Sequence, residues 1–248
     1  MVPFLSLGLL LSTPAVWAGA SRDMSGDDTV TFGTLGDWNP TVFSVCAWVD
    51  PDSFGESNLG RIADKASAGS TVARLGLRVN DSSTGFDNES FVVSRDGAVD
   101  EVCNGTESSV SLAGGWHFLC GTCNGTTCSC YRGTTTTNAV DVTGNQGTLN
   151  TAVDVSAMSM IVGSNVDVNR DFDGRIAYVH FYDRVLTLAE IQQLQWRPFS
   201  ITDGQKLFAP LWGDTTELDL SGNGATGTVS GSTASTDGPP VLLQGGSR

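Results

Sequence analysis

The acidic segment at residues 169–174, NRDFDG, has the residue types of a metal-binding loop. Its oxygen-bearing side chains are spaced as in the first half of an EF-hand loop and end at a glycine. Such a loop needs a bidentate glutamate six residues after the glycine, where this chain has His180. The alternation of valines and phenylalanine with polar residues around it also suits the entrance of a strand. We therefore expect a strand here and no EF-hand.

The six cysteines could form disulfides or bind zinc, and four of them crowd into CGTCNGTTCSC at residues 120–130. Zinc ribbons use two separated Cys-x2-Cys pairs, and four thiolates across one hairpin cannot easily surround a metal. An even cysteine count beside an export-like N-terminus favours disulfides. If residues 124–127 form the hairpin turn, Cys123 and Cys128 face each other, but the full pairing stays open.

No nucleophile motif surrounds a serine or a cysteine in the sequence, and GGWHF at residues 114–118 is not a nucleophile elbow. His117 and His180 flank expected strands, so we expect both side chains to pack in the core. The sequence predicts no catalytic residue.

The net charge and the composition limit which classes of partner and ligand the chain can bind. The 248 residues carry a net charge of −14 and two lysines, Lys65 and Lys206, so a phosphate backbone would be repelled and nucleic acid is excluded as a partner. Neutral ligands such as sugars, or cations, fit this charge better. The 40% of hydrophobic residues are enough for a core, and the scarcity of helix formers favours many short strands.

The N-terminal residues 1–20 form an apolar run that ends in small residues, as a secretory signal peptide does, although the basic start is missing. Pro3 and Pro14 make it too short and interrupted for a spanning helix. We expect either cleavage after Ala18 or Ala20, or an apolar segment that stays and packs. Export predicts an extracellular protein with no membrane insertion of the mature domain.

Alternating apolar residues predict strands through most of the chain. Phe43, Val45, Ala47 and Val49 form one face of the strand at residues 41–53. We expect a hairpin at 114–133, a central apolar strand at 158–164, and a long strand from 172 onward that is apolar on both faces and therefore interior. The expected helix is TLAEIQQLQ at 187–195, with Thr187 and Glu190 as a capping box, a stripe of Leu188, Ile191, Leu194 and Gln195, and Pro198 as its stop. The further strands are expected at residues 27–33, 61–65, 72–80 and 90–97.

Three motifs resemble the laminin-G-like branch of the concanavalin A-like lectins and glucanases: FSVCAWVDPD, the Trp-led hairpin GGWHFLCGTCNGTTCSCYRG, and FDGRIAYVHFYDRVLTLAEIQQL. Their order and spacing are similar to those of that family. QLQWRPF at residues 193–199, with the segment that follows it, is similar to uncharacterised domains from phages and marine microbes. The resemblance implies an all-β, antiparallel β-sandwich of the jelly-roll type with one short helix. It covers a domain at residues 21–200; the tail 201–248, with one strand, would pack on that domain or be a truncated repeat.

The resemblance also implies one structural calcium ion between the first strand and the long aromatic strand, with Asp27 and Asp28 as ligands. The position where the family frequently has a further acid is Ala177 in this chain, which weakens that site. The glucanase branch carries Glu-x-Asp-x-x-Glu on one strand; the nearest match, ELDLSG at 217–222, lacks the second glutamate, so we expect no enzyme.

The family resemblance predicts a non-catalytic recognition module that binds carbohydrate on a cell or virion surface. The alternative is a structural surface protein, such as a capsid decoration, fibre or adhesion component, that contacts proteins and assembles as a homo-oligomer or in a virion. Sugar sites combine aromatic faces with amide and carboxylate groups. We expect Trp48 and Trp116 to be buried in the core. The ligand-binding candidates are Trp38, Asn165, Asp167, Asn169, Arg170 and Trp212.

Overall fold

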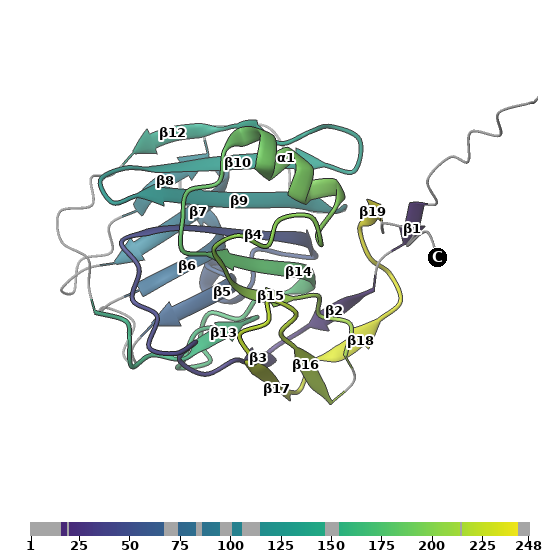
Figure 1. The fold of residues 1–248 in the computed structure, drawn as a ribbon. Coiled ribbons are helices and arrows are strands. Elements are labelled where there is room, and N and C mark those ends of the chain that lie inside the picture. The colour runs from purple at the N-terminus through teal and green to yellow at the C-terminus, as the bar shows by residue number, and fades with distance from the viewer. Residues whose placement is uncertain are drawn as a thin grey trace, which may run out of the picture.

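The computed structural model describes residues 16–18, 20–66, 74–82, 86–94, 101–105, 115–146, 154–213 and 215–242. Two antiparallel sheets pack face to face with one α-helix on the outside (Figure 1). The expected all-β sandwich is therefore confirmed. Within the described residues, no helix has the length and apolar character that crossing a membrane requires.

The first sheet contains the long strands of the three family motifs. The long strand that follows residue 172 lies at its centre, between two neighbours, as its apolar faces predicted. In sheet order the strands are β11 (Val140–Asp141), β10 (Cys128–Thr134), β9 (His117–Asn124), β4 (Val42–Pro51), β14 (Gly174–Tyr182), β2 (Ser21–Met24) and β18 (Thr233–Ser235), with β15 (Gln205–Ala209) also paired to β14.

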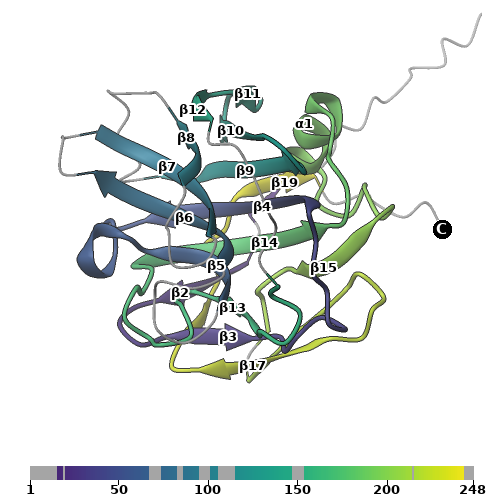
Figure 2. The same cartoon turned by 90° about the vertical axis from the view of Figure 1, so that its left-hand side faces the viewer.

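The second sheet faces the viewer in Figure 2. Its apolar strand at residues 160–162 lies between two others, as expected. In sheet order the strands are β12 (Thr143–Gln146), β8 (Glu101–Gly105), β7 (Phe86–Ser94), β6 (Arg74–Ser82), β5 (Arg61–Ala66), β13 (Met160–Val162), β3 (Thr29–Thr31), β17 (Thr226–Ser230) and β16 (Thr216–Leu218). A separate pair joins β1 (Val16–Ala18) to β19 (Pro240–Leu242).

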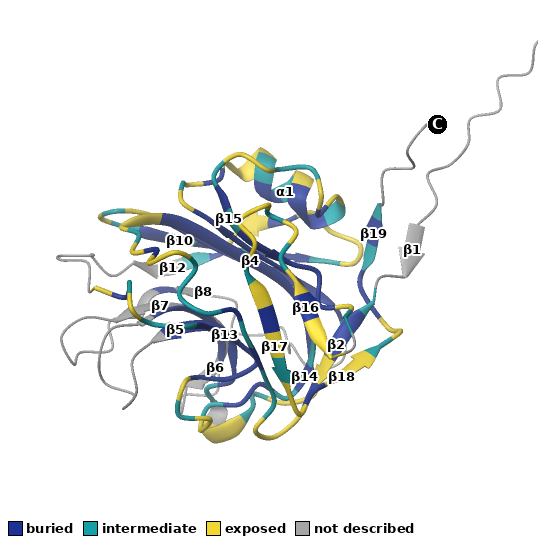
Figure 3. Ribbon diagram, turned by 60° about the horizontal axis from the view of Figure 1, so that its bottom comes forward, coloured by how far each residue is buried: buried dark blue, intermediate teal, exposed yellow. Residues whose placement is uncertain are grey.

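The first sheet is buried on both faces, and its central strands are dark blue in Figure 3. Its inner face meets the second sheet through the predicted set Phe43, Val45, Ala47 and Val49. Its outer face lies under the helix and includes Trp48 and Trp116, which are buried as expected.

A β-bulge in β14 changes the face that its side chains occupy. Tyr178 has a left-handed φ of 51°, and the pairing with β4 shifts between Ala177 and His180. Ile176 therefore faces the inner core while Tyr178 faces outward, although residues two apart share a face in a regular strand.

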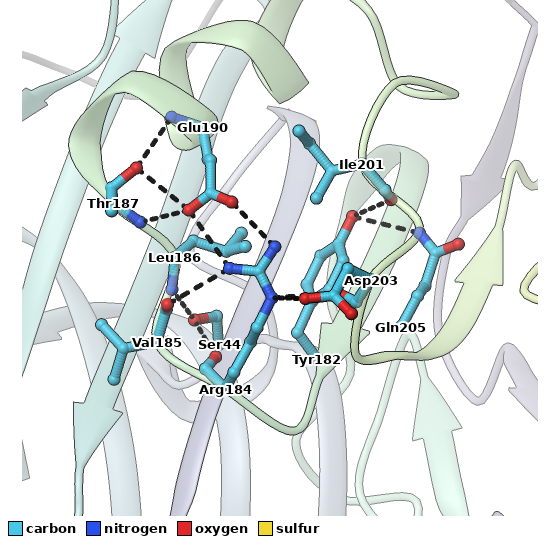
Figure 4. Close-up of polar contacts among 10 residues, drawn as sticks. All are labelled: Ser44, Tyr182, Arg184, Val185, Leu186, Thr187, Glu190, Ile201, Asp203 and Gln205. Carbon is cyan, nitrogen blue, oxygen red and sulfur yellow. Dashed lines mark hydrogen bonds and ion pairs between the residues drawn. The ribbon is translucent and has the colours of Figure 1, made fainter.

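The helix α1 (Leu188–Trp196) agrees with the helix predicted at residues 187–195 to within one residue at each end. The Thr187 side chain accepts a hydrogen bond from the Glu190 backbone N–H, and the Glu190 carboxylate accepts one from the Thr187 N–H. Arg184 donates to the same carboxylate (Figure 4). Ile191 and Leu194 are buried, but Leu188 is exposed, so the expected stripe is shorter than predicted.

The segment after residue 200 belongs to the sandwich. It adds β15 and β18 to the first sheet and β16 and β17 to the second. The buried guanidinium of Arg22 in β2 donates to the buried carboxylate of Glu217 in β16 and to the carbonyl of Ser232. The described strands after residue 200 therefore lie on the sandwich, as in the first of the two alternatives for this segment, and they extend both sheets past the expected boundary at residue 200. Residues 1–15 of the leader lie outside the described residues.

All six cysteines form disulfides. Cys123 and Cys128 bridge the ends of the β9–β10 hairpin, as predicted if residues 124–127 form its turn. The other two pairs are Cys46–Cys120, between neighbouring strands, and Cys103–Cys130, between the two sheets. No thiolate is left for the zinc alternative.

Candidate ligand-binding site

Three connections meet at one end of the sandwich because the strands that carry them end side by side. Gly174, at the start of β14, pairs with Met24 at the end of β2 and with Pro51 at the end of β4. We call the connections at residues 25–28, 52–60 and 163–173 the rim. The second includes the short 3-10 helix η1 (Glu56–Asn58).

The longest rim connection, residues 163–173, is held by its own side chains. The side-chain oxygen Oδ1 of Asn165 accepts a hydrogen bond from the Asn169 backbone N–H at 3.0 Å, and the side-chain amide of Asn165 donates to the Asn169 side-chain oxygen at 2.9 Å. Between them Val168 has a φ of 49°. A β-branched residue in this left-handed region is strained, and such strain concentrates at functional sites.

Backbone and side-chain hydrogen bonds join the rim connection at residues 52–60 to the one at residues 163–173. The Glu56 N–H donates to the Asp171 carbonyl at 2.9 Å, and the Asp52 N–H donates to the Asp173 carbonyl at 2.9 Å. The Ser53 hydroxyl donates to the Asp173 carboxylate at 2.6 Å. The rim is therefore preformed and requires little ordering when a ligand binds.

An open cavity of about 400 Å³ lies between the connections. A side chain at Gly55 would collide with the Asp171 carbonyl, because its Cβ would lie 2.1 Å from that oxygen. Glycine here lets the two connections close around the cavity. The lining residues are Gly26, Ser53, Gly55, Glu56, Asp171, Phe172 and Asp173.

The carboxylates give the cavity its electrostatic character. Burial raises the pKa of the Asp171 carboxyl above its usual range; the Ser164 hydroxyl, which donates to it, opposes this shift, and Glu56 and Asp27 add to it. Glu56 is exposed and Asp173 is partly exposed. Their oxygens can accept hydrogen bonds from a ligand that carries hydroxyl groups.

The four rim residues predicted as ligand contacts divide into different roles. Asn165 is buried and uses its amide to hold the loop, so it is not available to a ligand. Asn169 is exposed, and its amide nitrogen has no acceptor among the described residues. Arg170 and Asp167 are partly exposed. Asn169, Asp167 and Arg170 remain candidates.

The two predicted tryptophans lie away from the rim. Trp38 is 8% exposed and packs edge-to-face on Phe181 in the inner core. The prediction that its ring contacts a ligand is therefore wrong. Trp212 is 38% exposed and contacts Tyr178 on the outer face of the first sheet. The structure therefore does not bring Trp38, Trp212 and the rim residues into one site.

The two residues proposed for calcium, Asp27 and Asp28, are not part of a cluster of three carboxylates within the described residues. The Asp28 carboxylate accepts a hydrogen bond from the Ser25 N–H at 2.9 Å within its own turn, and Ala177 is a core residue without an oxygen-bearing side chain. In the described ranges, no three His, Cys, Asp or Glu side chains are grouped to hold a metal. Calcium at Asp27 and Asp28 stays a prediction.

The carboxylates of the partial glucanase pattern are occupied by structural contacts. Glu217 pairs with Arg22 and accepts from the Gly213 N–H, and Asp219 accepts from the backbone N–H groups of Phe208 and Ser221. His117 and His180 are buried, as expected.

Sequence reasoning missed the second rim connection. Ser53, Gly55 and Glu56 line the cavity, and their only signal was the turn composition after Pro51. Which turn lies beside residues 163–173 depends on strand pairing, and the sequence pattern does not reveal that.

The comparisons agree with this architecture. Residues 24–192 match the model of the concanavalin A-like lectin/glucanases superfamily. No curated protein matches the chain significantly.

Two solved structures share the fold at low sequence identity. A protein from Bacteroides ovatus, whose assignment as carbohydrate-binding is itself provisional, is 16% identical with a TM-score of 0.64 over 93% of this chain and 63% of its own. The chain thus spans somewhat less than two thirds of that protein. The heptameric SAP-like pentraxin from Limulus polyphemus is 10% identical with a TM-score of 0.50, over 88% of this chain and 95% of its own. The laminin-G-type motifs, the family-model match over residues 24–192 and the two-sheet fold all agree. The chain therefore belongs to the concanavalin A-like lectin/glucanases superfamily.

Proposed function

We propose that the protein is a non-catalytic carbohydrate-recognition module that binds sugar at the rim. The observation that carries this proposal is the preformed cavity between three connections, bordered by polar groups that point to solvent. Family membership supports the ligand class, because the superfamily is described by its lectins as well as its glucanases.

The rim offers both partners that a sugar hydroxyl needs. Glu56 and Asp173 supply acceptors, while the amide of Asn169 and the guanidinium of Arg170 supply donors. A cavity with several carboxylates in a chain of net charge −14 repels anionic sugars. We therefore expect a neutral saccharide.

The site is proposed to bind without turnover. Retaining and inverting glycosidases both need two carboxyl groups placed across the scissile bond. The carboxyl of Asp171 is buried and bonded to Ser164, which leaves it poorly placed to reach a glycosidic oxygen.

An exported location suits this role. Three disulfides form and persist in oxidising compartments, so we place the protein outside the cell. A glycan on a cell or virion surface would be its partner there.

A glycan array followed by calorimetric titration tests the proposal. The double variant Asn169→Ala/Arg170→Ala should weaken binding of the selected neutral saccharide by about tenfold or more, because two donors worth roughly 1 kcal/mol each are lost. Val166→Ala, an exposed apolar change in the same connection, is the matched control and should bind normally. Equal affinity of the double variant and the control would refute binding at the rim.

A further inference from the structure

Two aromatic rings stand exposed together on the outer side of the first sheet. Phe199 and Trp212 lie 25° from parallel with their centroids 5.9 Å apart, and they are 42% and 38% exposed. We call this pair the aromatic platform. It lies outside the rim.

Buried rings hold the aromatic platform in place. Phe199 packs edge-to-face on Phe208 at 5.0 Å, and Trp212 packs edge-to-face on Tyr178 at 6.2 Å. Phe208 is itself stacked on His180 at 4.3 Å. Because these supporting residues are buried, the exposed rings lose little freedom when a ligand covers them.

The segment that follows Phe199 is also fixed by hydrogen bonds. Figure 4 shows the Tyr182 hydroxyl donating to the Ile201 carbonyl at 3.0 Å and accepting from the Gln205 amide at 3.1 Å. These contacts anchor the chain two residues after the ring of Phe199.

Backbone strain accompanies the position of Trp212. The residue before it, Leu211, has a φ of 62° and a fully buried side chain. Tyr178, which supports the indole, has a φ of 51° at the bulge of β14, and its N–H donates to the Pro210 carbonyl at 3.2 Å. Non-glycine residues in this region are strained and persist where the surroundings enforce them, often at ligand sites. Here the strained turn directs Leu211 inward and Trp212 outward.

The exposed groups of the aromatic platform suit a sugar ring. The faces of aromatic rings are electron-rich and apolar, and they attract the polarised C–H groups of a pyranose. The indole N–H of Trp212 has no acceptor among the described residues, so it can donate to a ring or hydroxyl oxygen. We propose that the aromatic platform is a second saccharide site, which binds the C–H face of a neutral pyranose.

The two sites are separate but close enough for one polysaccharide chain. Tyr178 lies four residues along β14 from Gly174 at the rim, which is about 13 Å at ~3.3 Å per residue. Two sites on one protein raise the apparent affinity for a long polymer without new contacts. This inference rests on the proposed function for its ligand class, but not on the rim itself.

Titration with soluble neutral polysaccharides and their short oligosaccharides tests the aromatic platform. Trp212→Ala should weaken polysaccharide binding by about tenfold or more, because stacking area and a donor are both lost. Trp212→Phe keeps the stacking and should stay within about threefold of the original protein. Leu188→Ala, which trims a side chain of similar exposure on α1, is the matched control and should change nothing.

A nuclear magnetic resonance titration gives a readout that does not depend on the folding of Trp212→Ala. The indole N–H resonance of Trp212, identified as the one missing from Trp212→Phe, should shift when oligosaccharide is added. A resonance that stays fixed at saturation would overturn the inference.

The rim double variant separates this inference from the proposed function. Loss of all binding in that variant, with full binding by Trp212→Ala, overturns the aromatic platform and leaves the rim standing. The opposite pattern supports the platform and overturns the rim. Loss of self-association and not of sugar binding in Trp212→Ala identifies a protein contact and also overturns the inference.

Discussion

His180 shows how burial sets the chemistry of a single residue. Its ring is stacked on Phe208, and Nδ1 accepts a hydrogen bond from the Gln205 amide at 3.1 Å. Burial lowers the pKa of this imidazole from 6.5 to about 3. The ring is therefore neutral at neutral and mildly acidic pH, and it packs as an aromatic core residue.

This shift predicts a loss of stability in acid. Between pH 6.5 and 3 the unfolded chain binds a proton at His180 that the folded chain does not, so the free energy of unfolding falls as the pH falls. From pH 7 to pH 4.5 the loss from this residue is about 2.5 kcal/mol. Between pH 7 and pH 4.5, the free energy of unfolding of His180→Phe should therefore fall by about 2.5 kcal/mol less than that of the original protein, as measured by urea unfolding. His117, whose pKa burial also lowers, is present in both proteins and cancels. Equal acid sensitivity in the two proteins would contradict the assignment.

For single residues, the sequence predicted only some of the side chains that are buried in the core. Trp48 lies in strand β4, whose alternation marks the buried face, and Trp116 directly precedes strand β9. Trp38 lies outside a strand, where periodicity says nothing, and the fold buries it against Phe181. The side-chain amide of Asn165 could bind a ligand by its chemistry, but it donates a hydrogen bond to the Asn169 side chain instead. Residue type alone does not reveal such a local contact.

The helix α1 is the element that the sequence predicted most closely, because its signals are local. The capping box, the apolar spacing and Pro198 all lie within twelve residues of one another. The bulge of β14 and the meeting of the rim connections were not predictable in this way. They depend on which strands pair, and those partners are far apart in the chain.

The capping contact of α1 gives a prediction at this scale. Thr187→Ala removes the acceptor for the Glu190 N–H and should lower the free energy of unfolding by about 1 kcal/mol. Gln193→Ala, an exposed change within the same helix, is the control and should change stability by less than about 0.5 kcal/mol. Urea unfolding measures both. A Thr187→Ala protein as stable as the control would show that the cap contributes nothing.

At the scale of the whole molecule, the sequence predicted the sandwich but not its full extent. The Gly-rich composition after residue 200 resembles a tail, yet its short strands complete both sheets by pairing with β2, β3 and β14. Short polar strands have weak periodicity, so only the pairing reveals that they belong to the domain. The buried Arg22–Glu217 pair joins the two ends of the described chain.

The disulfides act at this scale because they constrain the unfolded chain. Cys103–Cys130 spans 27 residues and Cys123–Cys128 spans 5. Loop-closure entropy predicts losses of about 3.5 and about 2 kcal/mol when each pair is replaced by alanines. Denaturant unfolding of the two double variants should therefore rank the inter-sheet bridge as the larger contributor. The reverse order would mean that the bridges act mainly through the folded state.

The most direct test of carbohydrate recognition at the rim is a crystal structure of the protein with its selected neutral oligosaccharide. The account predicts sugar in the cavity between the three connections, with its hydroxyls bonded to Glu56, Asp173 and Asn169. Sugar bound elsewhere while the rim cavity holds only solvent would contradict it.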